Sequence, residues 1–216
     1  MIQLHYYPST AAMVPHILLE EIGVPYERVL VDRMKDAHKR PEYLHLNPNG
    51  LIPVLTDGEL VLYETAAIAL HLCDTHPDAR LAPAVGTTQR AHFYKWLVWM
   101  TNTLQAALIV YFYPERWMNE GNAAGVAELK ANAQRKVGDM LHQLDSELAR
   151  HRGPWFMGED HTALDAYAFT LCRWTRHFAT GRARDRAHLG PYLQRMLDRP
   201  AVQRVLAAEQ LSPPFV

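Results

Sequence analysis

The pattern of apolar residues changes near residue 80, and this change constrains the fold more than any other feature of the chain. Before it, short β-prone runs alternate with segments of helical periodicity, and after it only helical periodicity remains. The β-prone runs are residues 2–7, 26–31, 52–56 and 60–63, and the helical segments are 11–22 and 64–73. This order predicts a four-stranded mixed sheet with helices packed on it, followed by an all-helical region.

Turn signals mark the ends of the expected elements in the first region. Asp57-Gly58, between two short strands, is a strong hairpin signal, and residues 47–50 (NPNG) are dense in turn chemistry. Gly23 suits the C-terminal cap of the first helix. Pro15 lies inside that helix and is tolerated only near its first turn, so we expect the helix to start late or to bend there.

The second region is expected to be a set of amphipathic helices. Residues 76–87 combine proline and glycine with little periodicity, which is typical of a linker. We therefore expect a first domain over 1–77, a linker over 78–87 and an all-helical domain over 88–216. Helical patterns in the second domain cover residues 88–113, 126–149, 162–178, 189–198 and 201–208.

Composition excludes several classes of protein. With 49% apolar and 21% charged residues the chain is globular rather than disordered, and its net charge of -1 argues against a nucleic-acid partner. The longest strongly apolar stretch, 106–113, is far shorter than the roughly 20 residues of a membrane span. Residues 1–7 are too short for the apolar region of a signal peptide and no Lys or Arg precedes them, so we expect no targeting signal. We therefore expect a cytoplasmic protein with no membrane partner.

The cysteines and histidines indicate neither a disulfide framework nor a metal centre. Cys73 and Cys172 are the two cysteines of the chain and lie far apart in sequence, which is typical of a reducing compartment. The twelve histidines show no paired ligand spacing such as His-x-x-x-His. We expect no metal cofactor.

Four short motifs follow one another along nearly the whole chain: residues 47–54 (NPNGLIPV), 63–68 (YETAAI), 162–165 (TALD) and 195–202 (RMLDRPAV). In this order, and with the change of pattern near residue 80, they resemble the glutathione transferase family, in its cytosolic bacterial form and nearest to the Beta class. The resemblance implies an α/β thioredoxin-like N-terminal domain, with the four-stranded mixed sheet, and an all-α C-terminal domain. Asp165 of the third motif completes a capping box and is assigned no chemistry.

The resemblance implies that the first domain binds glutathione as a co-substrate. A cis Ile52-Pro53 bond, as in the family, would let an extended peptide pair with the backbone of Ile52 as an added strand. Glu64 and Thr65 lie at a helix N-terminus, where N–H groups and the Thr65 hydroxyl bind a carboxylate and Glu64 accepts from an α-ammonium group. Lys35 is placed near the glycyl carboxylate. The alternatives are an edge-strand proline, an ordinary helix cap and a solvated lysine.

The chemistry expected of the family is to hold glutathione as a thiolate, and here the sequence departs from the Beta class. A free thiol has a pKa of about 8.5, so a hydrogen bond to the sulfur is needed to favour the anion near neutral pH. Ala11 and Ala12 occupy the positions of the class's Cys and Ser, and Gln105 falls where that class often has His. No mixed disulfide with glutathione can form at Ala11.

Three other side chains are candidates for the donor to the sulfur. Ser9 and Thr10 lie where the first helix is expected to start, and Tyr6 matches the Tyr-x-Pro spacing of the tyrosine-type classes. Tyr6 and Tyr7 point to opposite faces of a strand, so at most one of them faces the site. We rank Ser9 first, Thr10 second and Tyr6 third as the catalytic residue. Plain helix capping is an equal alternative for Ser9 and Thr10.

The electrophile pocket is expected between the two domains, where aromatic side chains gather on and after the first long helix. These are Trp96, Trp99, Tyr111, Phe112, Tyr113 and Trp117. Aromatic residues at helical spacing more often pack in a core. Pro114 ends the helix and frees Tyr113 and Trp117, which are therefore our candidates for a hydrophobic substrate pocket.

The leading interpretation is a glutathione S-transferase that conjugates the thiolate to small hydrophobic electrophiles in detoxification. Glutathione-dependent peroxidase activity is a second enzymatic interpretation that the sequence does not separate from the first. A glutathione-binding or interaction protein without turnover is the alternative from another class, because the Cys and His of the Beta class are missing. The resemblance also implies a homodimer.

Overall fold

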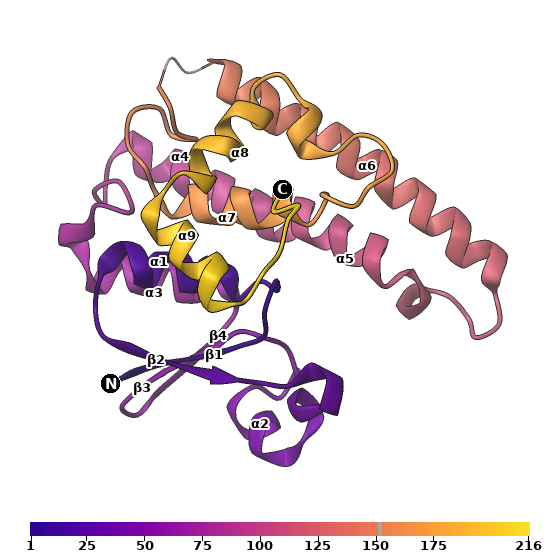
Figure 1. Ribbon diagram of the computed structural model, residues 1–216, viewed down its shortest axis with the longest axis horizontal. Helices are drawn as coiled ribbons and strands as arrows, with labels where there is room; N and C mark the ends of the chain where they lie inside the picture. Colours follow the sequence, from indigo (N-terminus) through magenta and orange to yellow (C-terminus); the bar gives the residue numbers. More distant parts are fainter. Residues whose placement is uncertain (151–152) are drawn as a thin grey trace.

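The computed structural model describes residues 1–150 and 153–216, and its N-terminal region is built on a four-stranded sheet. The strands lie in the order β2-β1-β3-β4 (Figure 1) and are β1 Ile2–Tyr6, β2 Tyr26–Leu30, β3 Val54–Asp57 and β4 Leu60–Tyr63. β1 and β2 are parallel, whereas β3 is antiparallel to both β1 and β4. The predicted mixed sheet is confirmed, and Gly58, at φ +58°, forms the hairpin turn.

Helices cover both faces of this sheet. The helices and short turns of the region are α1 Met13–Ile22, η1 Arg33–Lys35, η2 Ala37–Lys39, α2 Pro41–Leu46, α3 Thr65–Thr75 and η3 Pro77–Ala79. α1 and α3 lie on the side of the helical domain, and α2 lies against the opposite side (Figure 1). Leu4 and Leu55 belong to the core cluster of α1 and α3, whereas Val54 packs with Tyr43 of α2. Successive strand residues thus bury both faces of the sheet.

Both ends of α1 follow from its sequence. The helix starts late, at Met13, as the position of Pro15 indicates. Pro15 falls in the first turn, where a missing N–H breaks no intrahelical hydrogen bond. Gly23 ends the helix at φ +77° and donates its N–H to the Leu19 carbonyl at 2.9 Å, as predicted for its C-cap.

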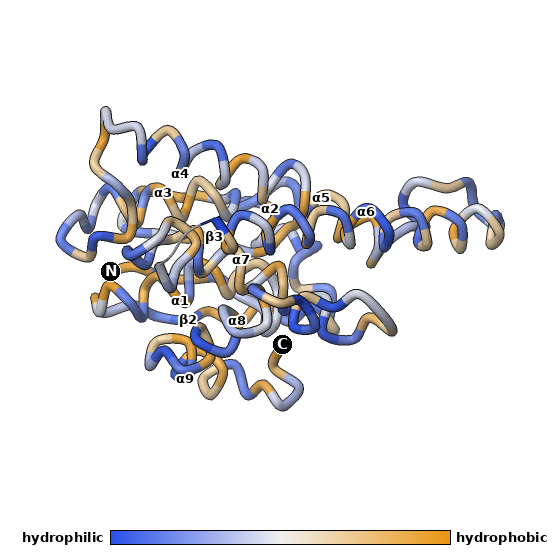
Figure 2. Tube along the Cα trace, turned by 90° about the horizontal axis from the view of Figure 1, so that it is seen from above, coloured by the Kyte–Doolittle hydropathy of each residue, from blue (hydrophilic) through white to orange (hydrophobic). Residues whose placement is uncertain are grey.

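The second region is helical, as predicted. Its elements are α4 Thr88–Trp99, η4 Met100–Gln105, α5 Ala106–Phe112, η5 Pro114–Trp117, α6 Ala123–Arg150, α7 Ala163–Arg173, η6 Ala183–Asp185, α8 Leu189–Leu197 and α9 Pro200–Ala208. Every residue of α7 is buried. The far ends of α5 and α6 project beyond the rest of the molecule (Figure 2). The domain limits 1–77 and 88–216 stay predictions.

The helix predicted over 88–113 is a continuous helical run with a π-helical segment, Met100–Gln105, in its middle. Such segments bond each residue to the fifth one along instead of the fourth, and they often occur near functional sites. Gln105, the last residue of the segment, accepts a hydrogen bond from the Tyr167 hydroxyl at 2.7 Å. The widened turn thus ends at a contact with α7.

The helix predicted over 162–178 ends five residues early, at Arg173. Just beyond it the Thr175 hydroxyl donates to the Cys172 carbonyl at 2.7 Å and accepts from the Ala183 N–H at 3.0 Å. Side-chain hydrogen bonds of this kind compete with the helical ones. The chain therefore leaves α7 in a series of turns instead of continuing as a helix.

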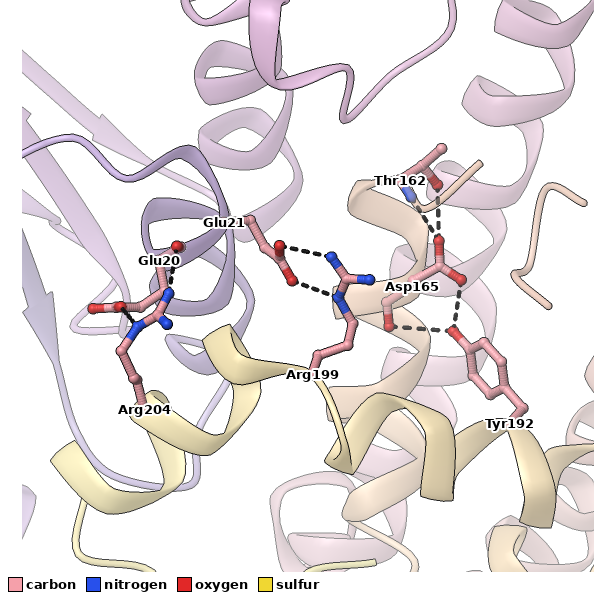
Figure 3. A network of polar contacts seen from close by, with 7 residues as sticks. All are labelled: Glu20, Glu21, Thr162, Asp165, Tyr192, Arg199 and Arg204. Carbon is pink, nitrogen blue, oxygen red and sulfur yellow. Dashed lines mark hydrogen bonds and ion pairs between the residues drawn. The ribbon is translucent and has the colours of Figure 1, made fainter. Parts of the chain in front are cut away.

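Two ion pairs fix α1 of the first domain to α9 of the second and to Arg199, the residue that precedes α9 (Figure 3). Arg199 binds Glu21 through two nitrogens, at 2.6 and 2.7 Å, and Arg204 binds Glu20. Paired contacts between arginine and carboxylate restrict orientation as well as distance. Because one apolar core cluster also runs from the sheet to α9, the two domains are packed against each other through both polar and apolar contacts.

Asp165 is a fully buried polar centre of the second domain. One carboxylate oxygen accepts from the Thr162 N–H at 2.7 Å, which forms the predicted capping box. The other accepts from the Phe156 N–H at 2.8 Å and the Tyr192 hydroxyl at 3.0 Å. Figure 3 shows Asp165 between Thr162 and Tyr192. This side chain joins α7, α8 and the preceding loop, which supports the structural role predicted for it.

Replacing Asp165 by Ala should lower the free energy of unfolding by about 2–4 kcal/mol, measured by urea denaturation. The loss leaves the buried N–H groups of Thr162 and Phe156 and the Tyr192 hydroxyl without an acceptor. Asp139→Ala removes an exposed carboxylate of α6 and should change stability by less than about 0.5 kcal/mol. Equal stability of the two variants would contradict the structural role of Asp165.

Candidate functional site

The strand register brings four chain segments to one end of the sheet. His5, near the end of β1, pairs with Val54 at the start of β3, and Val54 pairs with Tyr63 at the end of β4. Tyr6 pairs with Leu30, the last residue of the parallel strand β2. This end of the sheet is therefore the place where the loops after β1, β2 and β4 meet the turn before β3. Every site residue predicted in the first domain lies in one of these segments, at the last residue of β1 or at the first residue of α3.

The turn before β3 presents free backbone groups. The Ile52-Pro53 peptide bond is cis, as expected. The Leu51 carbonyl accepts from the Tyr43 hydroxyl at 2.7 Å and from the Asn47 amide at 2.8 Å, which holds the turn against α2. Within the described residues the N–H and C=O groups of Ile52 make no hydrogen bond. They are therefore available to an extended ligand.

Glu64 occupies the N-cap position of α3 with φ +70°, a left-handed value that is uncommon outside glycine and that concentrates at functional sites. Its side chain is exposed, does not cap the helix and forms no hydrogen bond or ion pair within the described part of the chain. An ordinary helix cap therefore does not account for it. An open carboxylate beside free helical N–H groups suits a ligand that carries both an ammonium and a carboxylate group.

Thr65, the first residue of α3, is buried and hydrogen-bonded to Tyr167 of α7. The Tyr167 hydroxyl donates to Gln105. Burial raises the pKa of Tyr167, and the Glu64 carboxylate acts in the same direction. Gln105, the residue at the position where the Beta class often has His, thus helps to tie the N-terminus of α3 to the helical domain.

Ser9 is held on two sides by the helical domain. Its backbone, at φ +63°, donates its N–H to Glu209 Oε2 at 2.8 Å. Its hydroxyl oxygen accepts from Arg173 Nη1 at 2.6 Å and, more weakly, from Arg176 Nη2 at 3.4 Å. The other oxygen of Glu209 lies 2.8 Å from His16 Nδ1. The N-cap of α1 is further along the chain and has no side-chain cap, so helix capping does not account for Ser9.

Thr10 and Tyr6, the other predicted donors, have different surroundings. The Thr10 hydroxyl donates to the Tyr7 carbonyl at 2.7 Å and accepts from the Ala12 N–H at 3.3 Å, so its proton is used within its own turn. The Tyr6 ring lies 6.0 Å from the ring of His16 and faces α1. Geometry therefore favours Ser9 over both as a donor to a ligand.

Tyr113 directly precedes η5, where the chain leaves the first long helical run, and Trp117 is the last residue of η5. The Tyr113 hydroxyl accepts from Arg33 Nη2 at 3.3 Å, and the Arg116 guanidinium lies 4.1 Å from the centre of the Tyr113 ring. Arg33 also lies 6.0 Å from the Tyr7 ring. Tyr113 therefore contacts the loop after β2 across the domain boundary, while the Trp117 side chain is half exposed beside it.

Lys35 lies at the same end of the sheet but points to solvent. Its side chain is 76% exposed and pairs with Asp32 at 3.3 Å. An exposed pair of this kind contributes little to stability and leaves the ammonium group free to change partner. A role for Lys35 in ligand binding stays a prediction.

Three residues that contact Ser9 are absent from the site predicted above: Arg173, Arg176 and Glu209. The available signal was Arg173 at the end of an otherwise largely apolar helical pattern, with a second arginine three residues later. A buried arginine is unusual because its charge must leave water. Nothing in the local sequence indicates that its partner lies 164 residues away.

The architecture, a thioredoxin-like domain joined to a helical domain, defines the class of the protein, and comparisons with known proteins give its family. Family models for the glutathione S-transferase N-terminal and C-terminal domains match residues 1–74 and 99–200. Glutathione S-transferase GstA of Escherichia coli O157:H7 is 29% identical, over 97% of this chain and 99% of its own. GstB of Escherichia coli K12 is 31% identical, over 88% and 89%.

A solved structure shows the same likeness in three dimensions. The crystal structure of a glutathione transferase homologue from Sulfitobacter, with bound glutathione, has a TM-score of 0.88 to this chain at 25% identity, over 98% of this chain and 99% of that one. The chain belongs to the glutathione S-transferase family. The predicted resemblance and fold class are confirmed, while the closer likeness to the Beta class stays a prediction.

Two further observations concern the described residues, 1–150 and 153–216. None of their helices combines the length and the apolar character that crossing a membrane requires. No three of their histidine, cysteine, aspartate or glutamate side chains gather closely enough to hold a metal ion.

The two cysteines should be unreactive in the native protein. Cys73 and Cys172 are buried, and burial raises the pKa of both thiols to about 12, so they stay protonated near neutral pH. An aromatic disulfide reagent should therefore titrate no thiol in the native protein and two per chain in denaturant. Cys73→Ser should give one in denaturant. Rapid reaction of a native thiol would show that one of these sites opens to solvent.

Proposed function

We propose that this protein conjugates the thiolate of glutathione to small hydrophobic electrophiles. The observation that carries the proposal is the meeting of three features at one end of the sheet: the free backbone of Ile52, the open N-terminus of α3 beside Glu64, and the Ser9 hydroxyl. In this order, they can bind the central peptide groups, the γ-glutamyl head and the thiol of glutathione.

In the proposed complex, the backbone of glutathione pairs with Ile52 as an added strand. The γ-glutamyl carboxylate accepts from the first N–H groups of α3, that of Thr65 among them, and Glu64 accepts from the α-ammonium group. Lys35 lies toward the glycyl carboxylate. The glutathione bound to the Sulfitobacter homologue supports a glutathione site in a chain of this fold.

Ser9 is the proposed donor to the sulfur. A hydrogen bond from its hydroxyl favours the thiolate over the thiol, and each unit by which the pKa of the thiol falls corresponds to about 1.4 kcal/mol. The thiol proton passes to water. The thiolate then attacks the electrophilic carbon, a C–S bond forms, and the leaving group departs with the electron pair of its bond.

The proposed electrophile pocket adjoins Tyr113, which contacts the first domain at Arg33, and Trp117, which ends η5. Aromatic walls suit a hydrophobic compound and exclude water from the reacting atoms. We further propose that the protein is a cytoplasmic homodimer, as the family resemblance implies.

Turnover distinguishes this enzyme from the two alternatives. With glutathione and 1-chloro-2,4-dinitrobenzene, the protein should form the thioether faster than the uncatalysed reaction, and calorimetry should detect glutathione binding. Turnover of cumene hydroperoxide alone would favour the peroxidase. Binding without turnover of either compound would favour a glutathione-binding protein, and no binding at millimolar glutathione would contradict all three.

Ser9→Ala should lower kcat/KM for 1-chloro-2,4-dinitrobenzene at least about tenfold near neutral pH, because the thiolate loses its hydrogen-bond donor. Thr10→Ala and Tyr6→Phe should lower it less, since the Thr10 proton and the Tyr6 ring are directed elsewhere. Steady-state kinetics of the three variants measure the loss of kcat/KM in each and so rank the three side chains. A larger loss in either of the latter two would move the donor role from Ser9 to that residue.

Glu64→Gln should raise the Kd for glutathione about tenfold, because the α-ammonium group loses its ionic partner. The KM for the electrophile should stay near that of the native protein. Glu59→Gln, at an exposed carboxylate of the β3–β4 hairpin, is the matched control and should bind normally. Calorimetric titration measures both, and equal affinities would place the ammonium group away from Glu64.

A further inference from the structure

The Ser9 hydroxyl is surrounded by groups that can only donate hydrogen bonds to it. A serine hydroxyl has one proton to donate and two lone pairs that accept, whereas a guanidinium group has donors and no acceptor. Arg173 Nη1 donates to the Ser9 oxygen at 2.6 Å, and Arg176 Nη2 approaches it at 3.4 Å. The lone pairs therefore face the arginines, and the hydroxyl proton is left for a third partner.

The backbone of Ser9 cannot serve as that donor, because its N–H is already bonded to Glu209 at 2.8 Å. Glu209 is buried, and its other oxygen contacts His16. The carboxylate thus fixes the loop that carries Ser9 and sets the direction in which the side chain leaves it. The group that Ser9 can offer to a ligand is its hydroxyl proton.

The two arginines form a cationic pair within the protein. The Arg173 side chain is 1% exposed, and its Nε has no hydrogen-bond partner in the described residues. Neither Arg173 nor Arg176 forms an ion pair with a carboxylate of residues 1–150 or 153–216. Arg176 Nη1 is instead anchored to the Arg173 carbonyl at 3.1 Å. A buried charge without an ion-pair partner costs stability, so structural support alone accounts poorly for this arrangement.

Arg173 keeps its charge in the pH range where a thiol is activated. Burial lowers the pKa of Arg173 to about 10, with Arg176 acting in the same direction and Glu209 against it. The group is therefore cationic near neutral pH. A positive charge in a site of low dielectric constant attracts an anion more strongly than the same charge in water does.

We propose that Arg173, assisted by Arg176, is a positioning residue for thiol activation: it holds the Ser9 hydroxyl as a donor toward the glutathione sulfur and stabilises the thiolate. The inference rests on the proposed function, in which Ser9 contacts the sulfur. Arg173 acts through Ser9 and does not touch the reacting atoms. The other charged or titratable groups around the Ser9 hydroxyl are Glu209 beyond α9, His16 of α1 and Arg176 beyond α7.

The test is the pKa of the thiol of glutathione bound to the full-length protein. It is obtained from the ultraviolet absorbance of the thiolate in the binary complex and from the pH profile of kcat/KM. In Arg173→Met we expect this pKa to rise by about one unit, which means about tenfold less thiolate at a pH below it. Arg173→Lys should restore part of the shift, because it returns a donor and a charge. Arg135→Met, at an exposed arginine of α6, should leave the profile unchanged.

Arg176→Met gives a second measurement at a partly exposed position, should Arg173→Met fail to fold. A smaller shift in the same direction is expected, since its contact with Ser9 is longer. An unchanged thiol pKa in folded, glutathione-binding Arg173→Met would overturn the proposal. If Arg173→Met does not fold, an unchanged thiol pKa in Arg176→Met would overturn it. Lower stability and weaker binding with an unchanged pH profile would show a merely structural role.

A double-mutant cycle with Ser9→Ala separates this inference from the proposed function. If Arg173 acts through Ser9, the two substitutions together should shift the pKa by clearly less than the sum of their single effects. Full additivity would overturn the proposal, because Arg173 would then act independently of the hydroxyl. If Ser9→Ala alone leaves thiol pKa and rate unchanged, the proposed role of Ser9 is wrong. If Ser9→Ala has its expected effect and Arg173→Met has none, only the inference about Arg173 is wrong.

Discussion

The pairing of β1 with β3, and of β3 with β4, determines where the candidate site can form. It aligns His5, Val54 and Tyr63 across three strands, so that three separate chain segments end or begin at the same end of the sheet. A strand register shifted by one residue would turn the core residues Leu4 and Leu55 to the other face of the sheet. The burial of these side chains in the core therefore also fixes the spacing between the Ser9 loop, Ile52 and Glu64.

The helical domain completes the site by contacts that cross the domain boundary. Glu209 and Arg173 hold Ser9, and Tyr167 holds Thr65. Ion pairs of Arg199 and Arg204 with α1 fix α9, which is followed directly by Glu209 (Figure 3). In the proposed function, the first domain thus contributes the groups that face glutathione, and the second domain sets their geometry. A change in the packing between α1, α7 and α9 is expected to reach the site without altering a ligand contact.

The sequence predicts the architecture well, because the features that determine it are local. The change from alternating to helical periodicity, the Asp57-Gly58 turn and the position of Pro15 each constrain a few neighbouring residues, and the structure agrees with all three. The prediction of a cis bond at Pro53 came from the family resemblance, and the structure also confirms it. Local patterns did not predict the π-helical segment, 100–105, because tertiary packing rather than periodicity selects such a widened turn.

The polar contacts of the candidate site, in contrast, could be predicted from the sequence only in part. The motif segments predicted Ile52, Glu64 and Thr65 as ligand-binding residues. The structure places them at one end of the sheet, but their ligand roles stay predictions. The contacts of Ser9 with Arg173 and Glu209 join residues 164 and 200 positions apart. Periodicity carries no information about such distances. Only the packing of α7 and α9 against α1 brings these groups together.

In the proposed function, Ala11 stands where the resemblance to the Beta class implies Cys, so another group must stabilise the thiolate. Ala11 and Ala12 are buried and apolar, so the start of α1 offers no side-chain donor there. Its first N–H groups still contribute the positive end of a helix dipole, with an effect of about 0.3–1 kcal/mol at an exposed site and more when buried. A shift of one pKa unit requires about 1.4 kcal/mol. At an exposed helix end the dipole alone falls short of this shift, and in the proposed function the Ser9 hydroxyl, backed by the buried Arg173, adds to it.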